Sequence, residues 1–490
     1  MASNKGWRVL LATVWLLPLL LTSAASTSLG NEHKERQCEL SRYQMQPRVF
    51  VLTDLSNEPD DQMSLVRILT YANELDIRGI SVVTSVWKND SLDLSILREV
   101  ISNGYANVTR NLNIHVPAAA RYPSASTLLN RTHAGHPVYG LAALELPLSD
   151  AARALITAGD EASPKRPLWV SIWGGANVLA EALQHVTKTR STRDKQSFVA
   201  KLRVYSISDQ DNAGPWIRYN YPQLMYIVSI HGFSEYTQAT WTGISGESSR
   251  GFDAGGPNST LVTNDWLQTH IRIGDLGHYY LVFQFIMEGD TPSFFPLIQN
   301  GLGVPDHPEW GSWGGRYTLA DASGNTRVYS NAPDSVQGVN GQYFLSAFAT
   351  IWRWRQEYQF DFATRMQWTI KNKYEDANHA PVAIVNDTCG PAHMEIKYKQ
   401  GNSVILDASK SWDPDGDDLG FNWFYYNSVT EPAGSAVVSR AVNISNISPS
   451  GSIVKVTPNA NTVLHIILAL QDKRALNETT YRRVILYPTA

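Results

Sequence analysis

Two hydrophobic patterns follow one another along the chain. In the first, apolar runs of strand length alternate with helical spacing: the run at 49–53 precedes Leu65, Ile68, Leu69 and Ala72, and a second run follows at 77–84. A strand, a helix and a strand in this order predict a βαβ unit, and hence a parallel sheet with a right-handed crossover. The alternation continues through strands at 168–172, 202–206 and 224–229 and a helix at 177–185. This part of the chain therefore predicts a doubly wound, mostly parallel α/β fold.

The second pattern occupies the C-terminal part of the chain. Residues 288–343 are rich in Gly, Pro and Trp and predict loops, and a helix at 343–362 is expected to close the α/β domain. Short apolar runs separated by turn residues then follow at 403–406, 420–426, 452–456, 463–470 and 482–487. Such a module predicts an Ig-like β-sandwich. We expect the α/β domain at 46–376 and the sandwich at 377–490.

The N-terminus has the pattern of a signal peptide. Lys5 and Arg8 precede an apolar run at 9–21, and small residues suited to cleavage follow at 22–25. The alternative is an N-terminal anchor, but the run is short for a membrane span, and no later segment is long enough. We predict a signal peptide at 1–25, a polar arm at 26–45, and a secreted, extracellular protein without a membrane span.

Export is consistent with two further features. Eight Asn-x-Ser/Thr sequons predict N-glycosylation at Asn89, Asn107, Asn130, Asn258, Asn386, Asn443, Asn446 and Asn477. The two cysteines, Cys38 and Cys389, both lie beyond the predicted leader. An oxidising compartment favours a disulfide between them, which would tie the arm to the last domain.

Composition narrows the class of partner. The formal net charge is −4, and removal of the basic leader makes it more negative. Because a phosphate backbone requires a basic surface and the chain has no Lys/Arg cluster, nucleic acid is not expected as a partner. The 15 Trp and 22 Tyr are explained either by core packing or, for some of them, by stacking on sugar rings. No pattern predicts an oligomeric state.

The strongest chemical signal is a cluster of acids after the first strand. Asp54, Glu58, Asp60 and Asp61 lie within eight residues, at the strand end where parallel sheets bind ligands. Four such acids repel one another unless a cation or a protonation shift relieves them, and carboxylates are preferred ligands of Ca²⁺. Capping of the following helix is the alternative, and it explains one or two of the acids.

Later loops contain candidate ligand-binding residues. Asn177 opens a predicted helix after Trp173-Gly174-Gly175, where backbone approaches a ligand closely or simply turns. Hydrogen-bonding side chains and aromatic rings suited to a hydroxyl-rich ligand are Asp209, Asp211, Asn212, His231, His307 and Trp313. Either histidine could protonate a leaving group, although a lone histidine is more often structural.

The acid loop resembles the signature of the inosine–uridine nucleoside hydrolases. In that family a strand ends in Asp-x-Asp-x-x-x-Asp-Asp, and the acids hold Ca²⁺, bind ribose hydroxyls and activate water. Asp54, Asp60 and Asp61 match three of the four acids, and Ser56 replaces the fourth. The replaced acid is the family's candidate base and a metal ligand, so either Asp54 or Glu58 takes over through a shifted loop, or the hydrolytic chemistry is altered or lost. The resemblance implies catalytic roles for Asp54 and Asp60 and metal ligation by Asp54 and Asp61, and Glu58 is a candidate contact of the substrate. It also implies that Glu288 or Asp290 supplies a late metal ligand.

A more specific resemblance covers residues 46 to 490. Several short sequence motifs are similar to cellulose-binding proteins that have a nucleoside-hydrolase-like domain and a C-terminal β-sandwich. These motifs lie at 53–61, 71–74, 173–177, 208–216, 288–293, 313–316 and 378–381. The acidic turn at 413–417 resembles a turn of other β-sandwich families, and it predicts a structural turn in preference to a calcium loop.

Two functions follow as hypotheses. The first is a metal-dependent hydrolase of a furanoside, nucleoside or cell-wall glycan, with Ca²⁺ as the cofactor, supported by the retained acids. The second is a non-catalytic binder of cellulose or another polysaccharide that keeps the hydrolase fold, supported by Ser56 and by export. In both cases the partner is a carbohydrate or a nucleoside-like small ligand.

Overall fold

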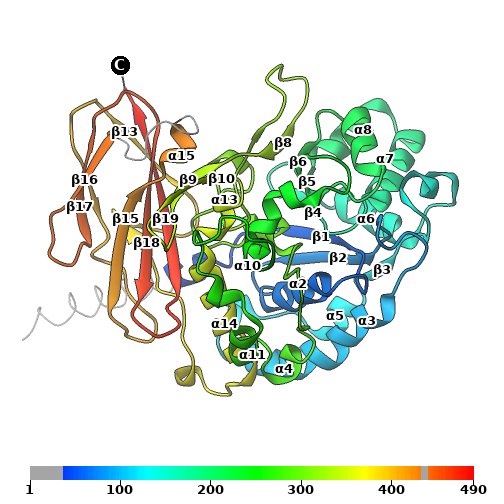
Figure 1. Cartoon of the computed structure of the whole chain (residues 1–490), viewed down its shortest axis with the longest axis horizontal. Coiled ribbons are helices and arrows are strands. Elements are labelled where there is room, and N and C mark those ends of the chain that lie inside the picture. Colours follow the sequence, from blue (N-terminus) through cyan, green and yellow to red (C-terminus); the bar gives the residue numbers. More distant parts are fainter. Residues whose placement is uncertain (1–36, 432–439, 490) are drawn as a thin grey trace, which may run out of the picture.

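The chain forms an α/β domain with a β module beside it (Figure 1). The computed structural model describes residues 37–431 and 440–489. The predicted signal peptide and the part of the arm at 26–36 therefore lie outside the described residues. Within the described chain, the predicted order of an α/β fold followed by a sandwich is confirmed.

The α/β domain is built on an eight-stranded sheet. Its strands in spatial order are β3 (Thr132–Ala134), β2 (Asp76–Val82), β1 (Arg48–Thr53), β4 (Leu168–Ile172), β5 (Leu202–Ser208), β6 (Met225–Ser229), β8 (Val328–Asn331) and β7 (Tyr317–Leu319). Every neighbouring pair is parallel except β7 with β8. The sheet is thus mostly parallel, as predicted.

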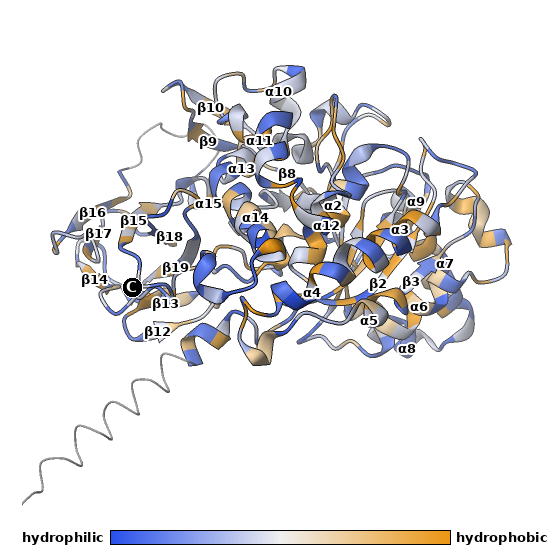
Figure 2. Ribbon diagram, turned by 90° about the horizontal axis from the view of Figure 1, so that it is seen from below, coloured by the Kyte–Doolittle hydropathy of each residue, from blue (hydrophilic) through white to orange (hydrophobic). Residues whose placement is uncertain are grey.

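Helices cover both faces of this sheet. The α-helices of the domain are α2 (Pro59–Thr70), α3 (Leu94–Glu99), α4 (Ala106–Leu112), α5 (Ala125–Leu129), α6 (Asp150–Asp160), α7 (Asn177–Thr189), α8 (Thr192–Ala200), α9 (Ala213–Asn220), α10 (Gly246–Arg250), α11 (Asn264–His270), α12 (Gly274–Gly277), α13 (Ala349–Trp352) and α14 (Arg355–Ile370). Hydrophilic and hydrophobic residues alternate along them, as expected for helices with one face in a core (Figure 2).

Strand β1 explains why both faces are covered. Val49 and Val51 pack into one hydrophobic core, whereas Phe50 and Leu52 pack into the core on the other face. Because successive side chains of a strand point to opposite faces, an uninterrupted apolar run requires burial on both sides. The first core includes α2 and α14, and the second includes α6, α7 and α9.

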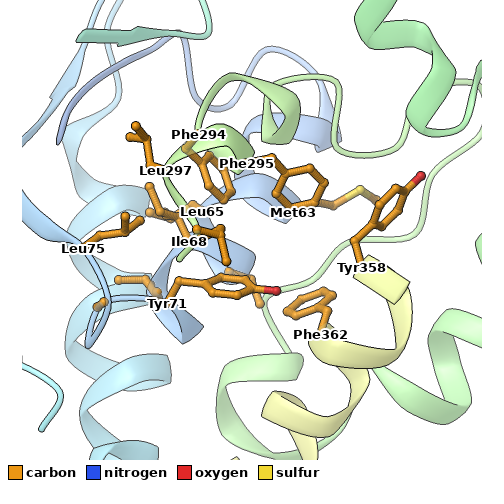
Figure 3. Close-up of a cluster of buried hydrophobic side chains, with 14 of the residues drawn as sticks. Met63, Leu65, Ile68, Tyr71, Leu75, Phe294, Phe295, Leu297, Tyr358 and Phe362 are labelled. Carbon is orange, nitrogen blue, oxygen red and sulfur yellow. The ribbon is translucent and has the colours of Figure 1, made fainter. Parts of the chain in front are cut away.

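Helix α2 is fixed by a dense apolar cluster (Figure 3). Met63, Leu65 and Ile68 lie on it at helical spacing, and all three are buried. Figure 3 shows them beside Phe294 and Phe295 and close to helix α14. This packing sets the position of the first turn of α2, which contains two of the acids.

The strand order reverses between β1 and β4. Strands β2 and β3 continue the sheet on one side of this point, and β5 and β6 continue it on the other. In open parallel sheets, connections leave toward opposite sides at such a point, and the carboxyl ends of the two central strands border a crevice. The acid loop after β1 and the turn after β4 meet there.

One predicted element is wrong at its start. Residues Tyr343–Ser346 form strand β10, which pairs antiparallel with β9 (Asp334–Gln337), and helix begins only at α13. The helix is also divided, since α13 ends at Trp352 and α14 begins at Arg355. The side chains along β10 are alternately exposed and half-buried, which is the period of two expected of a strand. The apolar content of this segment did not distinguish a strand from a helix.

The β module consists of two facing sheets. One contains β13 (Met394–Tyr398), β19 (Thr479–Pro488), β18 (Leu464–Asp472) and β15 (Leu419–Tyr425), and the other contains β14 (Val404–Asp407), β17 (Ile453–Pro458) and β16 (Val442–Asn446). Shorter elements are β11 (Ile384–Val385), β12 (Thr388–Cys389) and α15 (Asn427–Thr430). Both sheets contribute to one hydrophobic core, which is the packing of a sandwich. All five predicted strands form, and β13 and β16 are additional.

Polar and covalent contacts join the two parts. Arg483 of β19 is fully buried and donates to the carbonyls of Leu302 and Gly311 in the α/β domain. Cys38 and Cys389 form a disulfide with Cα atoms 5.5 Å apart. The N-terminal arm is thus bonded to the beginning of the β module.

The predicted glycosylation sites lie at the surface. Seven of the eight asparagines are exposed and the eighth, Asn477, is half-buried. Among the described helices, none is both long and apolar enough to cross a membrane.

Candidate functional site

Three buried aspartates converge at the strand-order reversal. Asp60 and Asp61 lie in the first turn of α2, and Asp290 precedes the short helix η7 (Thr291–Ser293). One carboxylate oxygen of each lies within 4.8 Å of the others, and each residue is at most 5% exposed. Segments 230 residues apart in the chain therefore place their acids together.

Asp54 completes the acidic wall at the end of β1. It is 3% exposed, and a Cβ added at Gly174 would lie 2.8 Å from its side chain. The turn after β4 therefore requires glycine for this close approach. The neighbouring Thr53 donates its hydroxyl to Asp61, which orients that carboxylate.

The acids raise one another's affinity for protons. Burial raises the pKa of Asp60 to about 8, and the charges of Glu58 and Asp54 add to the rise. Burial and neighbouring carboxylates also raise the pKa of Asp61 and Asp290 well above the ordinary value. Burial likewise raises the pKa of Asp54. Ionisation of all four aspartates in this poorly solvated cluster is therefore unfavourable.

This donor set fits a hard divalent cation. Oδ1 of Asp60 and Oδ2 of Asp290 are buried and make no hydrogen bond within the described chain. Oxygen ligands lie about 2.3–2.6 Å from Ca²⁺, so two ligands of one ion are at most about 5 Å apart. The 4.8 Å spread of the three aspartates meets this limit. A cation would compensate both the orphaned oxygens and the mutual repulsion.

The acid cluster predicts an unusual pH dependence of stability in calcium-free buffer. Because the pKa of Asp60 is about 8 in the folded chain and near 3.8 when exposed, the folded state binds more protons between these values. The stabilisation is therefore complete below about pH 4 and is lost as the pH rises toward 8. Thermal melts of Asp60→Asn should decline less than wild type from pH 5 to pH 8. Equal declines in the two proteins would contradict the shifted pKa.

A pocket with a cavity volume of about 260 Å³ opens beside the acids. Its acidic lining is Asp54, Glu58, Asp60, Asp61 and Asp290. Its other polar and aromatic lining residues include Asn57, Trp87, Trp173, Ser208, Gln210, Tyr236, Trp241, Arg250 and Phe285. The combination of buried carboxylates with aromatic rings is suited to a hydroxylated ring compound.

Glu288 is not part of the acid cluster. Its carboxylate is ion-paired with Arg67, and it also accepts hydrogen bonds from Tyr280 and Thr291. Its backbone has a φ of +53°, a conformation that is unfavourable for a side chain other than glycine. Its place as a metal ligand is therefore corrected: Glu288 braces the turn that presents Asp290.

Ser56, which replaces an acid of the related hydrolases, is bound by a lysine. Ser56 is exposed, has a φ of +74°, and accepts a hydrogen bond from the ammonium of Lys88. Lys88 also donates to the carbonyl of Leu55 at 2.6 Å. Glu58, by contrast, lines the pocket, where burial and the charge of Asp54 raise its pKa.

Four predicted sugar-binding residues serve the scaffold. Asn177 is buried and donates to Thr84, and Asp209 forms a two-pronged ion pair with Arg218 at 2.8 and 2.6 Å. Asp211 caps α9, and Asn212 accepts from the backbone of Leu141 at 2.9 Å. None of the four lines the pocket. The hydrogen-bonding groups of these four residues are therefore used within the fold.

The two histidines lie in different places. His231 contacts Ser208 of the pocket wall, with 3.0 Å between Nε2 and Oγ, but does not itself line the pocket. His307 pairs with Glu309 and stacks on Trp310. Trp310 in turn contacts the ring of His465 in the β module edge-on. His307 is therefore an interface residue, and its proposed contact with substrate is corrected.

Trp313 is also an interface residue. It is 1% exposed, and its indole N–H donates to Tyr481 of β19 at 3.3 Å. Of the aromatic residues that line the pocket, Trp173 lies in a turn singled out from the sequence, whereas Trp87, Tyr236, Trp241 and Phe285 were not selected. Trp87 follows the predicted strand at 77–84, and Tyr236 and Trp241 follow the one at 224–229, so their position after strands at the ligand-binding edge was the available signal.

Comparisons with known proteins identify the family. The sequence profile described as "Cellulose-binding Sde182, nucleoside hydrolase-like domain" matches residues 48–317, more than half of the chain. This chain belongs to that family. A second profile, "Cellulose-binding protein Sde0182, C-terminal domain", matches residues 403–488 of the β module. The family is thus cellulose-binding and nucleoside-hydrolase-like.

A solved structure supports the assignment across both parts. A nucleoside hydrolase-related hypothetical protein from Saccharophagus degradans, associated with carbohydrate metabolism, is 31% identical. The match covers 91% of this chain and all of that one, with a TM-score of 0.72.

More distant structures resemble the chain only weakly. The effector protein XOO4466 and the type III effector XopQ, solved with adenosine diphosphate ribose, are each 11% identical, with TM-scores of 0.30 and 0.32. Each match covers 70% of this chain and 98% of the effector. Among curated proteins, none matches the chain.

Proposed function

We propose that this family member is a calcium-dependent hydrolase of glycosyl bonds that acts on a furanoside or a cell-wall glycan. The observation that carries the proposal is the convergence of Asp60, Asp61 and Asp290, with unpartnered buried oxygens, on the wall of a pocket at the strand-order reversal. Membership of a cellulose-binding, nucleoside-hydrolase-like family supports a carbohydrate ligand.

Each acid has a distinct proposed role. Asp61 and Asp290, with Asp60 or Asp54 beside them, would hold Ca²⁺, which supplies charge neutralisation and a fixed point for sugar hydroxyls. Asp60 orients a hydroxyl of the sugar. Asp54 accepts a proton from the attacking water, for which a raised pKa is suitable.

The bond changes follow from these roles. The water oxygen forms a bond to the anomeric carbon while one water proton passes to Asp54. The bond to the leaving group breaks, and the leaving group departs with the bonding electron pair and takes up a proton from solvent. Positive charge develops on the ring during this exchange, and the surrounding carboxylates stabilise it. Because the four aspartates are at most 5% exposed, their charges act in a medium of low dielectric constant.

One observation favours a second candidate, a binder without turnover. Ser56 stands where the related hydrolases have an acid, and its hydroxyl accepts from Lys88 rather than facing the cluster as a base. A ligand could still be held by the remaining acids. This protein would then bind polysaccharide in an inherited hydrolase pocket.

Turnover and binding can be separated with one panel. Nucleosides, aryl furanosides and wall glycans are incubated with the whole protein, with Ca²⁺ or with chelator, and released base or reducing sugar is measured. The hydrolase proposal expects release that chelator abolishes and that Asp54→Asn lowers by about 10²-fold or more. Binding that needs Ca²⁺, with no release from any substrate, would establish the binder instead.

We also propose that the protein is secreted and glycosylated. The leader-like N-terminus supports export, and seven exposed sequon asparagines are accessible to glycosylation. The Cys38–Cys389 disulfide is suited to an oxidising compartment. Expression of the full chain in a eukaryotic host should yield the protein in the medium, with a mass that falls after removal of N-glycans.

A further inference from the structure

An exposed tryptophan stands at the mouth of the acid pocket. Trp87 is 53% exposed, although it lines the same pocket as the buried aspartates. Phe285, from a segment about 200 residues away in the chain, lines the pocket too and is 45% exposed. Large aromatic rings gain much by burial, so an exposed ring beside a polar pocket is suited to contact with a ligand.

The turn that carries Trp87 is held by its own hydrogen bonds. Ser85 Oγ accepts from the backbone N–H groups of Trp87 and Lys88 at 3.1 and 3.2 Å, and Ser85 donates its backbone N–H to the Lys88 carbonyl at 3.0 Å. Val86 donates to the carbonyl of Gln210 at 2.6 Å, which ties the turn to the loop after β5. Trp87 is thereby presented from a fixed backbone.

The same turn is fastened to the acid loop. Lys88, the residue after Trp87, donates to the carbonyl of Leu55 and to the hydroxyl of Ser56. These two acceptors are the residues that directly follow Asp54 in the chain. The exchange of the family's acid for Ser56 thus has a structural consequence. Ser56 and Lys88 set the position of the Trp87 ring relative to the acids.

A second ring extends this surface. Tyr236 lies edge-on to Trp87, with ring centroids 6.2 Å apart and planes inclined by 62°. Its hydroxyl donates to the carbonyl of Asp209 at 3.1 Å, and its ring contacts His231 edge-on. Tyr236 is therefore anchored at both its hydroxyl and its ring.

We propose that Trp87 and Tyr236 form a second sugar-binding subsite, at the exposed rim of the acid pocket, so that the ligand is a glycan chain end of at least two rings. One ring would occupy the pocket beside the aspartates, and the next would stack on Trp87. This inference rests on the proposed carbohydrate ligand of the pocket. It specifies that ligand as an oligosaccharide rather than a free nucleoside or monosaccharide.

The chemistry of the surface favours a sugar ring. The apolar C–H face of a pyranose or furanose ring packs on an aromatic face, while its hydroxyls stay in water at an open rim. A nucleobase would also stack on an aromatic ring, but the family to which this chain belongs is cellulose-binding. The glycan is therefore the occupant that agrees with both observations.

A chain-length series tests the subsite. Binding of glucose and of β-1,4-gluco-oligosaccharides with two to six rings, and of the matching arabinofuranose series, is measured by calorimetry in Ca²⁺. Deglycosylated protein is used, because the sequon at Asn89 is two residues from Trp87. Wild type should gain affinity on passing from one ring to two. Trp87→Ala should lower the affinity for ligands of two or more rings by roughly tenfold relative to its effect on a single ring, and Trp87→Phe should restore most of that difference.

Controls separate this inference from the function on which it rests. Tyr219→Ala removes a ring that is 86% exposed on α9 and lines none of the described pockets, so it should change nothing. If Asp61→Asn abolishes oligosaccharide binding and Trp87→Ala leaves it intact, only the subsite is overturned. If wild type binds neither series, the carbohydrate ligand and the subsite both fall. Loss of nucleoside binding in Trp87→Ala, without loss of glycan binding, assigns the ring to a nucleobase and rejects the proposal.

Discussion

Asp61→Asn is expected to lower the affinity of the protein for Ca²⁺ by about 100-fold or more. Asp61 is 4% exposed, belongs to the trio within 4.8 Å, and is oriented by the hydroxyl of Thr53. An amide keeps the shape but supplies no negative charge, and Ca²⁺ affinity depends strongly on the number of charged ligands. Titration calorimetry on the full chain measures the loss directly.

The same variant should show the effect in thermal melts. A ligand that binds only the folded state at 100 times its dissociation constant stabilises the protein by about 2.7 kcal/mol, so Ca²⁺ should raise the melting temperature of wild type but not of Asp61→Asn. Asp265→Asn, which changes an exposed acid in the first turn of α11, is the matched control and should bind as wild type does. Wild-type affinity in Asp61→Asn would refute the cation site.

Arg67→Met is expected to destabilise the folded protein by about 3–5 kcal/mol. Arg67 and Glu288 are both fully buried and form an ion pair, and Arg67 lies 4.0 Å from the centroid of the Phe362 ring. Removal of one partner of a buried pair leaves the other charge uncompensated, which costs far more than the pair itself contributes. Urea unfolding of wild type and variant measures the difference.

Two further variants show whether the stranded charge is the cause. Adding Glu288→Gln to Arg67→Met should recover part of the loss, because the remaining group is then neutral and its amide oxygen still accepts from one of the two hydroxyls of Tyr280 and Thr291. Arg190→Met breaks a partly exposed pair with Asp160 and should cost at most about 1 kcal/mol. A similar loss at both arginines would contradict this explanation.

Periodicity predicted most of the scaffold. Uninterrupted apolar runs predicted β1, β2, β4, β5 and β6, because strands buried on both faces show no alternation. The helix expected at 343–362 failed at its start, where Tyr343–Ser346 pairs as a strand with Asp334–Gln337. The two segments form a hairpin, and a short apolar segment has the same pattern whether it forms a helix or pairs with a neighbouring strand.

The site was predicted in part. Asp54, Asp60 and Asp61 could be identified because they follow one strand closely, so their proximity is local. Asp290 could be proposed only through the family resemblance, and the neighbouring Glu288 was assigned with it although its carboxylate belongs to Arg67. Two acids separated by one residue look alike in a sequence, but the turn between them directs one to the cluster and the other to the arginine.

The sequence by itself determined the order of folds, the location of the acid loop at a strand end, and the exchange of an acid for Ser56. These are properties of neighbouring residues, and local periodicity and spacing express them fully. Only the tertiary structure decided which later side chains reach the pocket, because that depends on how distant turns pack. It excluded His307 and Trp313, which lie at the interface with the β module, and it brought Trp87 to the rim through Lys88 and Ser56.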